Sequence, residues 1–515
     1  MQILMRSGKD PFTVVSPETT VAQDVLHGNV GNHLYSHAVH KTLLVPGTEI
    51  VSNATLSETR AATADDVART NERFDAFVVP LANAFRPGFR RRLRNLTDFI
   101  RELEIPVVVV GVGIQVDGLH DDETQLDYIA PEVTDFVSAV LDRSASIGVR
   151  GEMTKRYLSR LGFPSSAVSV IGCPSLFLQG RDLTLPTETA TLDRDSPITV
   201  SFTPGVEKIA EILERQATRY PRLTYIAQDR RTLELLLWGE NPRELKDPRA
   251  PVHTAHPLYQ QDRMRIFLDP WPWLDFVSRS DFAFGTRFHG CVAAILAGTP
   301  ALLLAHDSRT VELAEYHGMP HRAVNEVAVD VDAAELLEMY DPTEFNGLHG
   351  PRFDTYLDFL QVNGLAHIHQ PGNENPEFDA KVARTSYPDA VRTLCAPPPD
   401  SVASRLRWLR DSRPFDQTQH EHAYHPPFPH PAPSRTPDAE AWAALDSRLD
   451  TLDRMVAEQR TVINKQRKRL DRQQLALSRQ HQQVVVLREQ LAKQIAQSRR
   501  PTLKERVAKV LGLTR

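Results

Sequence analysis

The four consecutive valines of IPVVVVGVGIQ (105–115) constrain the fold more than any other feature of the sequence. β-Branched residues on both faces of a strand indicate burial on both sides, which is typical of a parallel sheet covered by helices. The preceding residues agree, because 74–85 predicts a strand ending in a polar loop and 87–104 carries apolar residues at helical spacing. A predicted helix at 131–144 and strand at 146–150 continue the alternation. We therefore expect a parallel α/β domain in the first part of the chain.

The same alternation begins again after a stretch rich in Thr, Asp and Pro at 181–197. PITVSF (197–202) predicts the first strand of this second series, and 281–307 predicts a strand, a helix and a further strand. A chain of 515 residues exceeds the size that one hydrophobic core usually reaches. We therefore predict two Rossmann-like lobes, residues 1–185 and 196–325, that face a cleft.

The sequence changes character after the second series. Residues 326–419 have no clear period, and we expect a mixed segment that packs on the lobes. A linker rich in Pro and His follows at 420–437. Residues 438–499 predict a coiled coil, because apolar residues recur every seven positions at Leu449, Val456, Ile463, Leu470, Leu477, Val484 and Leu491. One amphipathic helix lying on its own domain is the alternative, and we favour a homo-oligomer formed through residues 445–491.

Charge is divided unevenly along the chain. The whole sequence has a net charge of -6, but residues 454–515 hold 16 basic and 4 acidic side chains, which leaves -18 on the remainder. The tail at 500–515 predicts a short basic amphipathic helix, for which peripheral contact with an anionic membrane and a solvated charged end are both open. No nucleic-acid partner is expected, because the basic residues lack interleaved aromatics and the rest of the chain is acidic.

Composition excludes several classes of protein. Hydrophobic residues make up 41% and charged residues 24%, as in soluble globular proteins, and no run of about 18 apolar residues would span a bilayer. The three cysteines, Cys173, Cys291 and Cys395, are far apart, which argues against a disulfide framework or a zinc site and favours a reducing compartment. The N-terminal residues lack the apolar region of a signal peptide. We therefore expect a cytoplasmic protein that can sit at the inner face of the membrane.

The hexapeptide GTRFHG (285–290) follows an apolar strand and precedes an alanine-rich helix. Gly285 and Gly290 would let the backbone pass close to a ligand, and a helix expected to begin near Gly290 would add amide groups. Arg287 and His289 stand at the carboxyl end of the strand, where doubly wound sheets bind ligands. These groups suit a phosphate or carboxylate with a proton to move. A packed strand end with a structural ion pair is an equally open interpretation.

Two further segments place polar residues at comparable positions. In SIGVRGEMT (146–154), Arg150 ends a predicted strand and a helix follows. In GNVGN (28–32), Asn29 and Asn32 stand at a loop before a helix that we expect to start near Asn32. Such a loop suits a phosphate or a sugar, but the motif alone favours a plain turn with an Asn helix cap.

Three histidines follow this loop, at spacings of four and three residues: His33, His37 and His40. Their spacing resembles that of metal ligands on one helix face. No carboxylate or cysteine stands near them in the sequence, however, so we predict surface or capping positions rather than a metal site.

Four blocks, taken in order, resemble the polysaccharide pyruvyl transferases. They are GNVGN before a helix, VVVVGVGIQ, SIGVRGEMTKRYLSRLGF followed by VSVIGCPSLFL, and FGTRFHGCVAAILAGTPALLLAHDSRTVELAEYHGMP. The resemblance covers residues 25–325, and GTRFHG is its most specific part. The chain departs from the family at three places. Asn32 and Gly151 stand where the family often has Asp, and Asp307-Ser308-Arg309 replaces a common lysine.

The resemblance implies a two-lobed fold of GT-B type and an enzyme that transfers a pyruvyl group from phosphoenolpyruvate to a sugar. The acceptor would be a hydroxyl pair of a cell-surface polysaccharide or its precursor. Arg150 and Arg287 would hold the phosphate and carboxylate of the donor, and His289 would transfer a proton. Arg309 would neutralise the departing phosphate. The resemblance implies no metal and no cofactor, because arginines can hold phosphate as it leaves.

For the saccharide acceptor, the resemblance implies contacts from Asn29 and Asn32. Two other functions remain open, because fold does not fix function. One is a GT-B-type glycosyltransferase that uses a nucleotide-sugar, for which a nucleotide would stabilise the protein. The other is a non-catalytic scaffold acting through its coiled coil, for which self-association without donor binding would be diagnostic.

Overall fold

The computed structural model describes most of the first 395 residues and short parts of the remainder. The described residues are 1–116, 123–206, 208–239, 247–395, 405, 424, 488, 490, 491, 493, 494 and 503–512. They fall into two units, Met1–His430 and Pro431–Arg515. Apart from a few single positions, the predicted linker at 420–437 and coiled coil at 438–499 lie outside the described residues, and both stay predictions.

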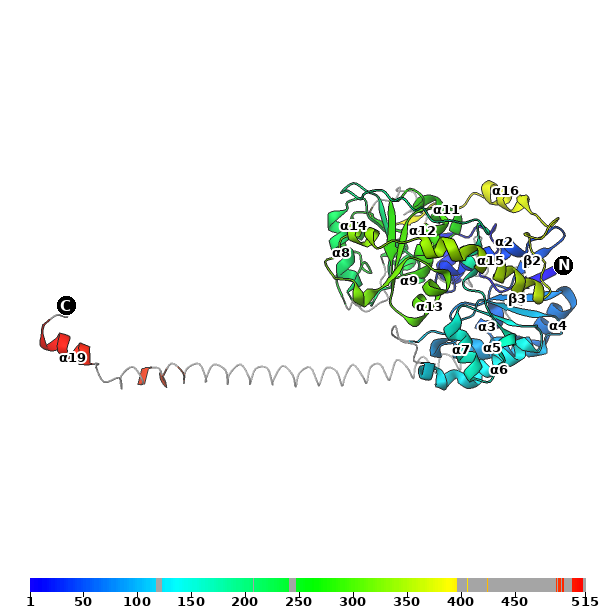
Figure 1. The fold of residues 1–515 in the computed structure, drawn as a ribbon, viewed down its shortest axis with the longest axis horizontal. Helices are drawn as coiled ribbons and strands as arrows, with labels where there is room; N and C mark the ends of the chain where they lie inside the picture. The colour runs from blue at the N-terminus through cyan, green and yellow to red at the C-terminus, as the bar shows by residue number, and fades with distance from the viewer. Residues whose placement is uncertain are drawn as a thin grey trace. The chain divides into compact units, whose positions relative to one another are not determined.

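The described part of the first unit contains two larger, mainly parallel sheets and the two-stranded sheet β5-β6, and the N-terminal part of the chain builds the first of the larger ones (Figure 1). Its strands run parallel in the order β2-β1-β3-β4 and comprise β1 (Gln2–Met5), β2 (Glu49–Ser52), β3 (Ala76–Pro80) and β4 (Val107–Val110). A parallel bridge between Val112 and Val149 extends the sheet to β5 (Ile147–Val149), which pairs with β6 (Val168–Val170). The order 2-1-3-4-5-6 is that of a doubly wound fold.

Helices cover strand β4 on both of its faces. Its odd-numbered valines belong to a core shared with α5 (Arg90–Glu102) and α6 (Ala130–Leu141). Its even-numbered valines belong to a core on the opposite face, shared with α2 (Gly31–Leu43) and α15 (Thr343–Val362). The prediction of a strand buried on both sides is therefore confirmed. Because α15 comes from far along the chain, the first lobe is not one continuous segment.

The second sheet has seven strands in the order β12-β11-β10-β7-β8-β9-β13. They are β7 (Ile198–Ser201), β8 (Thr224–Ala227), β9 (Met264–Ile266), β10 (Phe282–Gly285), β11 (Ala301–Ala305), β12 (His321–Ala323) and β13 (Val391–Arg392). All pairings are parallel except that of the edge strand β13 with β9. Read from β9 to β12, the order is the Rossmann order 3-2-1-4-5-6, which reverses between β7 and β10. Ligands of such sheets bind outside the carboxyl ends of the strands at this reversal.

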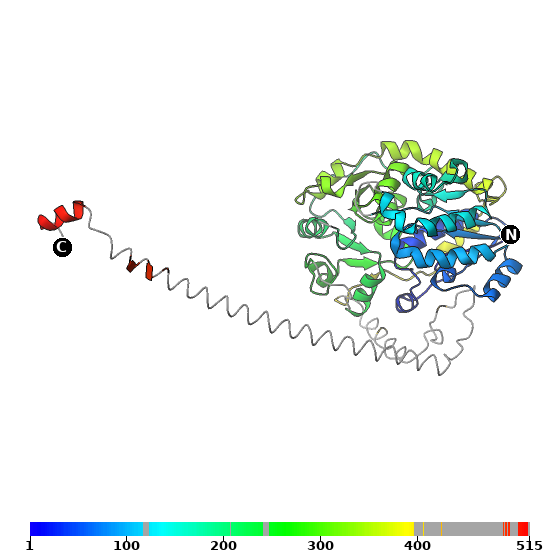
Figure 2. The ribbon, with the colours of Figure 1, turned by 90° about the horizontal axis from the view of Figure 1, so that it is seen from below.

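The remaining helices connect and cover these strands (Figure 2). Before residue 185 they are α1 (Pro17–Ala22), α3 (Leu56–Thr59), α4 (Ala64–Arg73) and α7 (Glu152–Arg160). Beyond it they are α8 (Ile209–Arg219), α9 (Arg230–Trp238), α10 (Pro257–Gln260), α11 (Pro270–Val277), α12 (Phe288–Leu296), α13 (Ser308–His317), α14 (Ala333–Glu338) and α16 (Pro376–Arg384). The fold class predicted from the sequence, α/β with parallel sheets, is confirmed.

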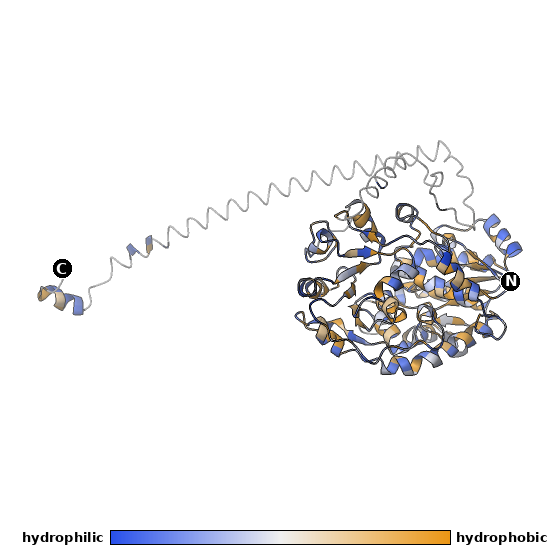
Figure 3. Cartoon of the chain, turned by 90° about the horizontal axis from the view of Figure 1, so that it is seen from above, coloured by the Kyte–Doolittle hydropathy of each residue, from blue (hydrophilic) through white to orange (hydrophobic). Residues whose placement is uncertain are grey.

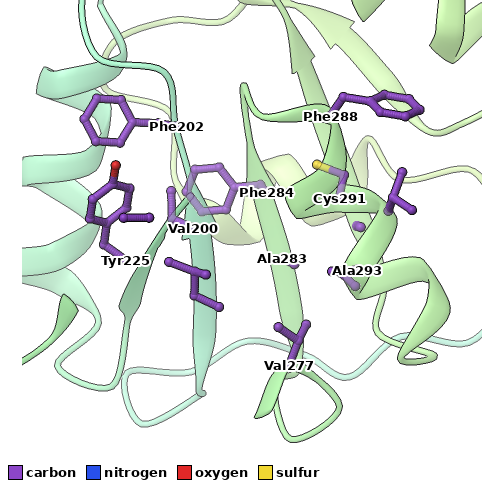
Figure 4. Packing of buried hydrophobic residues seen from close by; sticks show 14 of the residues in the cluster. Val200, Phe202, Tyr225, Val277, Ala283, Phe284, Phe288, Cys291 and Ala293 are labelled. Carbon is purple, nitrogen blue, oxygen red and sulfur yellow. The ribbon is translucent and has the colours of Figure 1, made fainter. Parts of the chain in front are cut away.

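The core of the second lobe fixes the strand ends that carry the predicted site. Figure 4 shows Phe284 of β10 beside Val200 of β7, with the rings of Phe202 and Tyr225 beyond them; those two ring centres are 4.9 Å apart. On α12, the Sγ of Cys291 lies 3.6 Å from the carbonyl oxygen of Leu302, so this helix packs directly on the sheet. Hydrophobic residues gather in this interior, and hydrophilic residues occupy the outer sides of the helices (Figure 3).

Residues after 325 contribute to both lobes. Helix α14 places Leu336 in the core of the second lobe, α15 places Phe353 in the core of the first, and β13 joins the second sheet. In the second unit the structure describes α19 (Leu503–Val510), where the side chain of Val510 is 86% exposed. Among the described residues, no helix combines the length and the hydropathy needed to cross a bilayer.

Candidate active site

The chain turns from β10 directly into α12, and this turn carries the GTRFHG motif. Arg287 is the N-cap of α12 and Phe288 is its first residue, so the helix begins two residues earlier than the sequence predicted. His289 therefore lies within the first helical turn rather than in front of the helix. Both polar side chains stand at the carboxyl end of β10, where the strand order of the sheet reverses.

Packing inside the second lobe explains the two glycines of the motif. A Cβ at Gly285, whose φ is 146°, would lie 1.9 Å from the carbonyl oxygen of Ser201. A Cβ at Gly290 would lie 2.4 Å from the Cβ of Ser201. The absence of side chains thus lets β10 and α12 approach the end of β7. The close approach that the sequence assigned to a ligand is made here by Ser201.

The imidazole of His289 lies where the two lobes meet. Gly31, the first residue of α2, packs against it, since a Cβ there would lie 2.4 Å from Nδ1. Nε2 lies 3.8 Å from the Sγ of Cys173. Burial and three positive charges lower the pKa of His289 well below 6.5; in decreasing order of effect the charges are Arg150, Arg309 and Arg287. The ring is therefore neutral at pH 7 while these charges stand unopposed.

Arg150 contributes a buried positive charge from the end of β5. The residue is 1% exposed, and its Nε donates to the carbonyl oxygen of Gly111 at 3.0 Å. Its guanidinium carbon lies 5.6 Å from the ring centre of Tyr35. Its Nη2 has no hydrogen-bond partner, and no described carboxylate lies within 4.0 Å of the group. An unpaired buried charge costs several kcal/mol, so this guanidinium is suited to an anion that enters the site.

Arg287 approaches the same region from the second lobe. Its Nη2 lies 3.4 Å from Oδ2 of Asp229, and its Nε donates to the carbonyl oxygen of Phe202 at 3.3 Å. Asp229 is itself fixed, because it caps α9 by accepting from the amide of Thr232 at 3.1 Å. The structural ion pair considered for this motif therefore exists, and the same arginine also lies close enough to His289 to lower its pKa.

Arg309 lies in the first turn of α13, beside the helix cap Asp307. Its Nη2 is 3.3 Å from Oδ2 of Asp307, and its Nε is buried without a partner among the described residues. Asp307 accepts from the amide of Thr310 at 2.8 Å and lies 3.7 Å from Nε2 of His306. Burial acts to raise the pKa of Asp307, but the charges of Arg309 and His306 and the hydrogen bonds from Thr310 together outweigh it, and the net shift is downward. This carboxylate is therefore ionised and orients Arg309.

Two residues that the sequence did not single out belong to the same region. The Nε of Arg86, after β3, is buried and has no partner in the part of the chain that the structure describes. Burial, followed by the charges of Arg309 and Arg92, lowers the pKa of Arg86. Gln115, after β4, lies 3.4 Å from Oδ2 of Asp307 through its Nε2. Both residues lie in loops that follow the carboxyl ends of strands of the first sheet. Their position after predicted strands was the one signal that could have identified them.

Asn29 and Asn32 shape the loop in front of α2. Oδ1 of Asn29 accepts from the amide of Gly31 at 2.7 Å, and the backbone of Asn29 forms a bridge with Asp229 in the second lobe. Nδ2 of Asn32 donates to the carbonyl oxygens of residues 26–27, each at 3.2 Å. Helix α2 begins at Gly31, one residue before the predicted start. Both side chains are partly exposed.

The three histidines of α2 are buried, so the prediction of surface or capping positions is wrong. His33 and His37 are each 1% exposed and His40 is 5% exposed. Nδ1 of His33 lies 3.0 Å from the carbonyl oxygen of Leu268, which belongs to the second lobe. Burial is the main cause that lowers the pKa of His33 to about 4. The sequence pattern misled because α2 is packed by both lobes and leaves little of its surface in water.

Arginines of both lobes thus lie close enough to one neutral imidazole to lower its pKa. Arg150 comes from the first lobe, whereas Arg287 and Arg309 come from the second. Such an arrangement attracts a small, multiply charged anion, and binding it would raise the pKa of His289 by opposing the arginine charges. Fold and site together define a class, a protein of two doubly wound lobes with buried cationic side chains and one imidazole where the lobes meet.

Comparison with known families narrows this class. The family model described as polysaccharide pyruvyl transferase matches residues 29–308, which is more than half of the chain and includes Arg150, Arg287 and His289. The chain belongs to the polysaccharide pyruvyl transferase family, and membership implies a transferase. None of the curated proteins matches the chain.

Several solved structures are similar in fold. The UDP-GlcNAc 2-epimerase of Methanocaldococcus jannaschii, in complex with UDP-GlcNAc and UDP, has a TM-score of 0.36 and 13% identity, covering 70% of this chain and 100% of the other. A putative UDP-N-acetylglucosamine 2-epimerase from Listeria monocytogenes has a TM-score of 0.35 and 9% identity, covering 76% and 98%. At these values the similarities assign no activity to this chain.

Replacing Arg150 with Met is expected to raise the free energy of unfolding and to abolish stabilisation by added anions. Met keeps most of the side-chain volume but removes the buried charge, which should gain on the order of 1 kcal/mol or more in an anion-free buffer. Denaturant unfolding with and without phosphate measures both effects. Arg91→Met, on the exposed side of α5, is the control and should change stability by less than about 0.5 kcal/mol. A clear loss of stability in Arg150→Met without anion would contradict this account.

Proposed function

We propose that this protein transfers the pyruvyl group of phosphoenolpyruvate to two hydroxyls of a saccharide and forms a cyclic ketal. The observation that supports this most is the environment of Arg150. Its guanidinium is buried, and Nη2 has no hydrogen-bond partner among the described residues. The charge of Arg150 also lowers the pKa of His289. A buried donor of this kind is suited to an anionic substrate. The family to which the chain belongs supplies the identity of the donor.

Phosphoenolpyruvate carries a phosphate and a carboxylate on adjacent atoms, so its recognition needs two cationic groups that approach from different directions. Guanidinium groups suit both anions, because each can form paired hydrogen bonds with two oxygens. Arg150 and Arg287 come from different lobes and are proposed to bind these two groups. Arg309, held beside Asp307, is proposed to stabilise the phosphate as it leaves.

His289 is proposed to protonate the methylene carbon of the donor. In the free protein its pKa lies well below 6.5, with burial and then Arg150 as the largest causes. When the donor anion opposes the arginine charges, the pKa of His289 rises and the ring can take up the proton that it then delivers. The same imidazole is thus a poor acid before the donor binds and a competent one afterwards.

The reaction balances without any further reactant. Protonation of the methylene gives a methyl group and an electrophilic carbon, to which the first sugar hydroxyl adds with loss of its proton. The second hydroxyl then displaces phosphate at the same carbon, and its proton leaves with the phosphate. Two C–O bonds form, the C–O bond to phosphate breaks, and the products are the pyruvate ketal and inorganic phosphate. His289 recovers its proton from the first hydroxyl in this scheme.

Asn29 and Asn32 are proposed to contact the acceptor, because both side chains are partly exposed beside Gly31, which packs on His289. Their contacts with the loop use one group of each amide: Oδ1 of Asn29 accepts from Gly31, and Nδ2 of Asn32 donates to backbone carbonyls. The other group of each amide, Nδ2 of Asn29 and Oδ1 of Asn32, is proposed to form a hydrogen bond with a sugar hydroxyl.

The proposal is tested by thermal unfolding with phosphoenolpyruvate and with nucleotide-sugars, followed by turnover assays. We expect phosphoenolpyruvate alone to raise the midpoint in the wild type and not in Arg287→Ala. Arg150→Ala and His289→Ala should reduce turnover by at least about 100-fold, the usual contribution of a general acid. His253→Ala, at a partly exposed position of the second lobe, is the control and should retain activity. A midpoint raised by a nucleotide-sugar alone would indicate a glycosyltransferase, and no shift with any compound would favour a scaffold.

We further propose that the C-terminal region places the enzyme at the inner face of a membrane, with self-association through residues 445–491. Helix α19 presents exposed apolar side chains at Val507 and Val510 and exposed basic ones at Lys504 and Lys509, and the exposed Leu511 directly follows it. This combination is typical of helices that lie on anionic lipid surfaces.

Cosedimentation of the full chain with lipid vesicles tests this placement. Vesicles rich in phosphatidylglycerol should bind the protein at low salt, and binding should weaken as salt screens the attraction. Neutral phosphatidylcholine vesicles should bind much less. Replacing Lys504 and Lys509 together with Glu should remove the difference between the two lipids. Equal recovery of the wild type with both kinds of vesicle would refute membrane placement by charge.

A further inference from the structure

One face of α13 joins the second lobe to the backbone of the first. Three residues at intervals of four, Ser308, Glu312 and Tyr316, form this inter-lobe face. Oγ of Ser308 accepts from the amide of Val116 at 3.2 Å, and Oη of Tyr316 donates to the carbonyl oxygen of Val170 at 2.8 Å. Residues spaced by four lie on one side of a helix, so α13 presents a continuous polar edge to the first lobe.

Glu312, in the middle of this edge, caps a helix of the opposite lobe. Its Oε1 accepts from the amide of Thr154 at 2.7 Å, and its Oε2 accepts from the hydroxyl of Thr154 at 3.1 Å. Thr154 is the third residue of α7, and its amide is the one that an N-cap side chain normally satisfies. The N-cap of α7 is Gly151, which has no side chain to offer.

The space at Gly151 is occupied by Glu312 itself. A Cβ at Gly151 would lie 2.3 Å from Cγ and 2.8 Å from Oε1 of Glu312. A carboxylate side chain can therefore stand at position 151 or at position 312, but not at both, with the backbone as it is. Because φ of Gly151 is -170°, its backbone is extended and accepts any residue, so the glycine serves to make room rather than to adopt a special conformation.

The capped helix turn holds Arg150 in place. Arg150 directly precedes Gly151, and the hydroxyl of Thr154 also accepts from the amide of Ile114, in the loop after β4. The same loop abuts the arginine, since a Cβ at Gly113 would lie 2.9 Å from Cδ of Arg150. On the other side, Glu312 is one helical turn beyond Arg309. One carboxylate thus connects the arginines of the two lobes through rigid backbone.

We propose that Glu312 is a positioning residue that caps α7 from the opposite lobe and thereby sets the distance between Arg150 and the His289–Arg309 side of the site. The carboxylate makes no contact with the substrate in this role. The proposal rests on the anion site described above, but it does not depend on phosphoenolpyruvate being the anion. It also explains why Gly151 can replace the Asp that the family often has at this place, because α7 receives its cap from α13.

Hydrogen exchange in the absence of any ligand tests the positioning role. In Glu312→Ala the amides of Thr154 and Val116 should both exchange about tenfold faster or more, because the cap and the neighbouring inter-lobe bond are both weakened. Glu312→Gln keeps an oxygen acceptor and should retain most of the protection. Adding Gly151→Asp to Glu312→Ala supplies a cap within α7, so Thr154 should regain protection while Val116 stays fast. Unchanged exchange at Thr154 in Glu312→Ala would overturn the cap, and recovery at both amides in the double variant would overturn the inter-lobe role.

Anion affinity provides a second readout. With phosphoenolpyruvate and inorganic phosphate as probes, Glu312→Ala should bind about tenfold more weakly than the wild type. The double variant should stay weak although its helix is capped, and full recovery of affinity there would overturn the proposal. If the wild type binds phosphate but not phosphoenolpyruvate, the proposed function fails while the test of Glu312 stands. If it binds neither, the exchange data alone decide the role of Glu312.

If Glu312→Ala folds poorly, the unfolding midpoints of variants at Gly151 test the contact between Gly151 and Glu312 instead. Gly151→Asp alone should lower the unfolding midpoint, because its side chain meets Glu312. Glu312→Ala should then raise the midpoint of Gly151→Asp, since it removes the clash and leaves the new cap in place. A double variant less stable than Gly151→Asp would contradict the arrangement. Gly162→Asp is the control. It should also lower the unfolding midpoint, because the φ of this glycine is 99°, but a Cβ there would have no neighbour within 4 Å. Glu312→Ala should therefore not restore the midpoint of Gly162→Asp.

Discussion

The buried charge of Arg150 is the constraint on which the site depends. A guanidinium that is 1% exposed and has an unpartnered Nη2 costs free energy, and the surrounding structure must hold it in place. Its charge, together with those of Arg309 and Arg287, acts with burial to lower the pKa of His289. The pKa of His289 therefore depends on the net charge of the site, and an entering anion changes the net charge and this pKa together.

The fold meets this constraint by joining the lobes at several places around the site. Helix α2 begins against His289 and buries its histidines against both lobes. Helix α13 begins beside the site with Arg309 and continues along the first lobe through Ser308, Glu312 and Tyr316. Helix α15 returns from beyond the second lobe to cover the first sheet. Contacts of this kind restrict how the arginines of the two lobes can move apart.

Local sequence patterns predicted much of the fold and the position of the GTRFHG motif. They could not predict the contacts between the lobes. The valines of β4 alternate between two cores, as their β-branched run indicated, and the GTRFHG motif does stand at a strand end. The packing roles of Gly285 and Gly290 depend on Ser201, which is far away in sequence. Burial of His33 and His37 depends on the second lobe covering α2, and the cap that Glu312 gives to α7 joins residues 158 positions apart. No periodicity or spacing within a single segment reports such pairs.

Proton uptake on donor binding tests whether burial and the arginine charges together hold His289 neutral until an anion opposes those charges. Calorimetric titration with phosphoenolpyruvate at pH 7, repeated in buffers of different ionisation enthalpy, counts the protons exchanged. We expect net proton uptake by the wild type, because the pKa of His289 starts well below 6.5 and rises on binding, and we expect His289→Gln to lose this uptake. Binding without proton uptake, or the same uptake in His289→Gln, would contradict it.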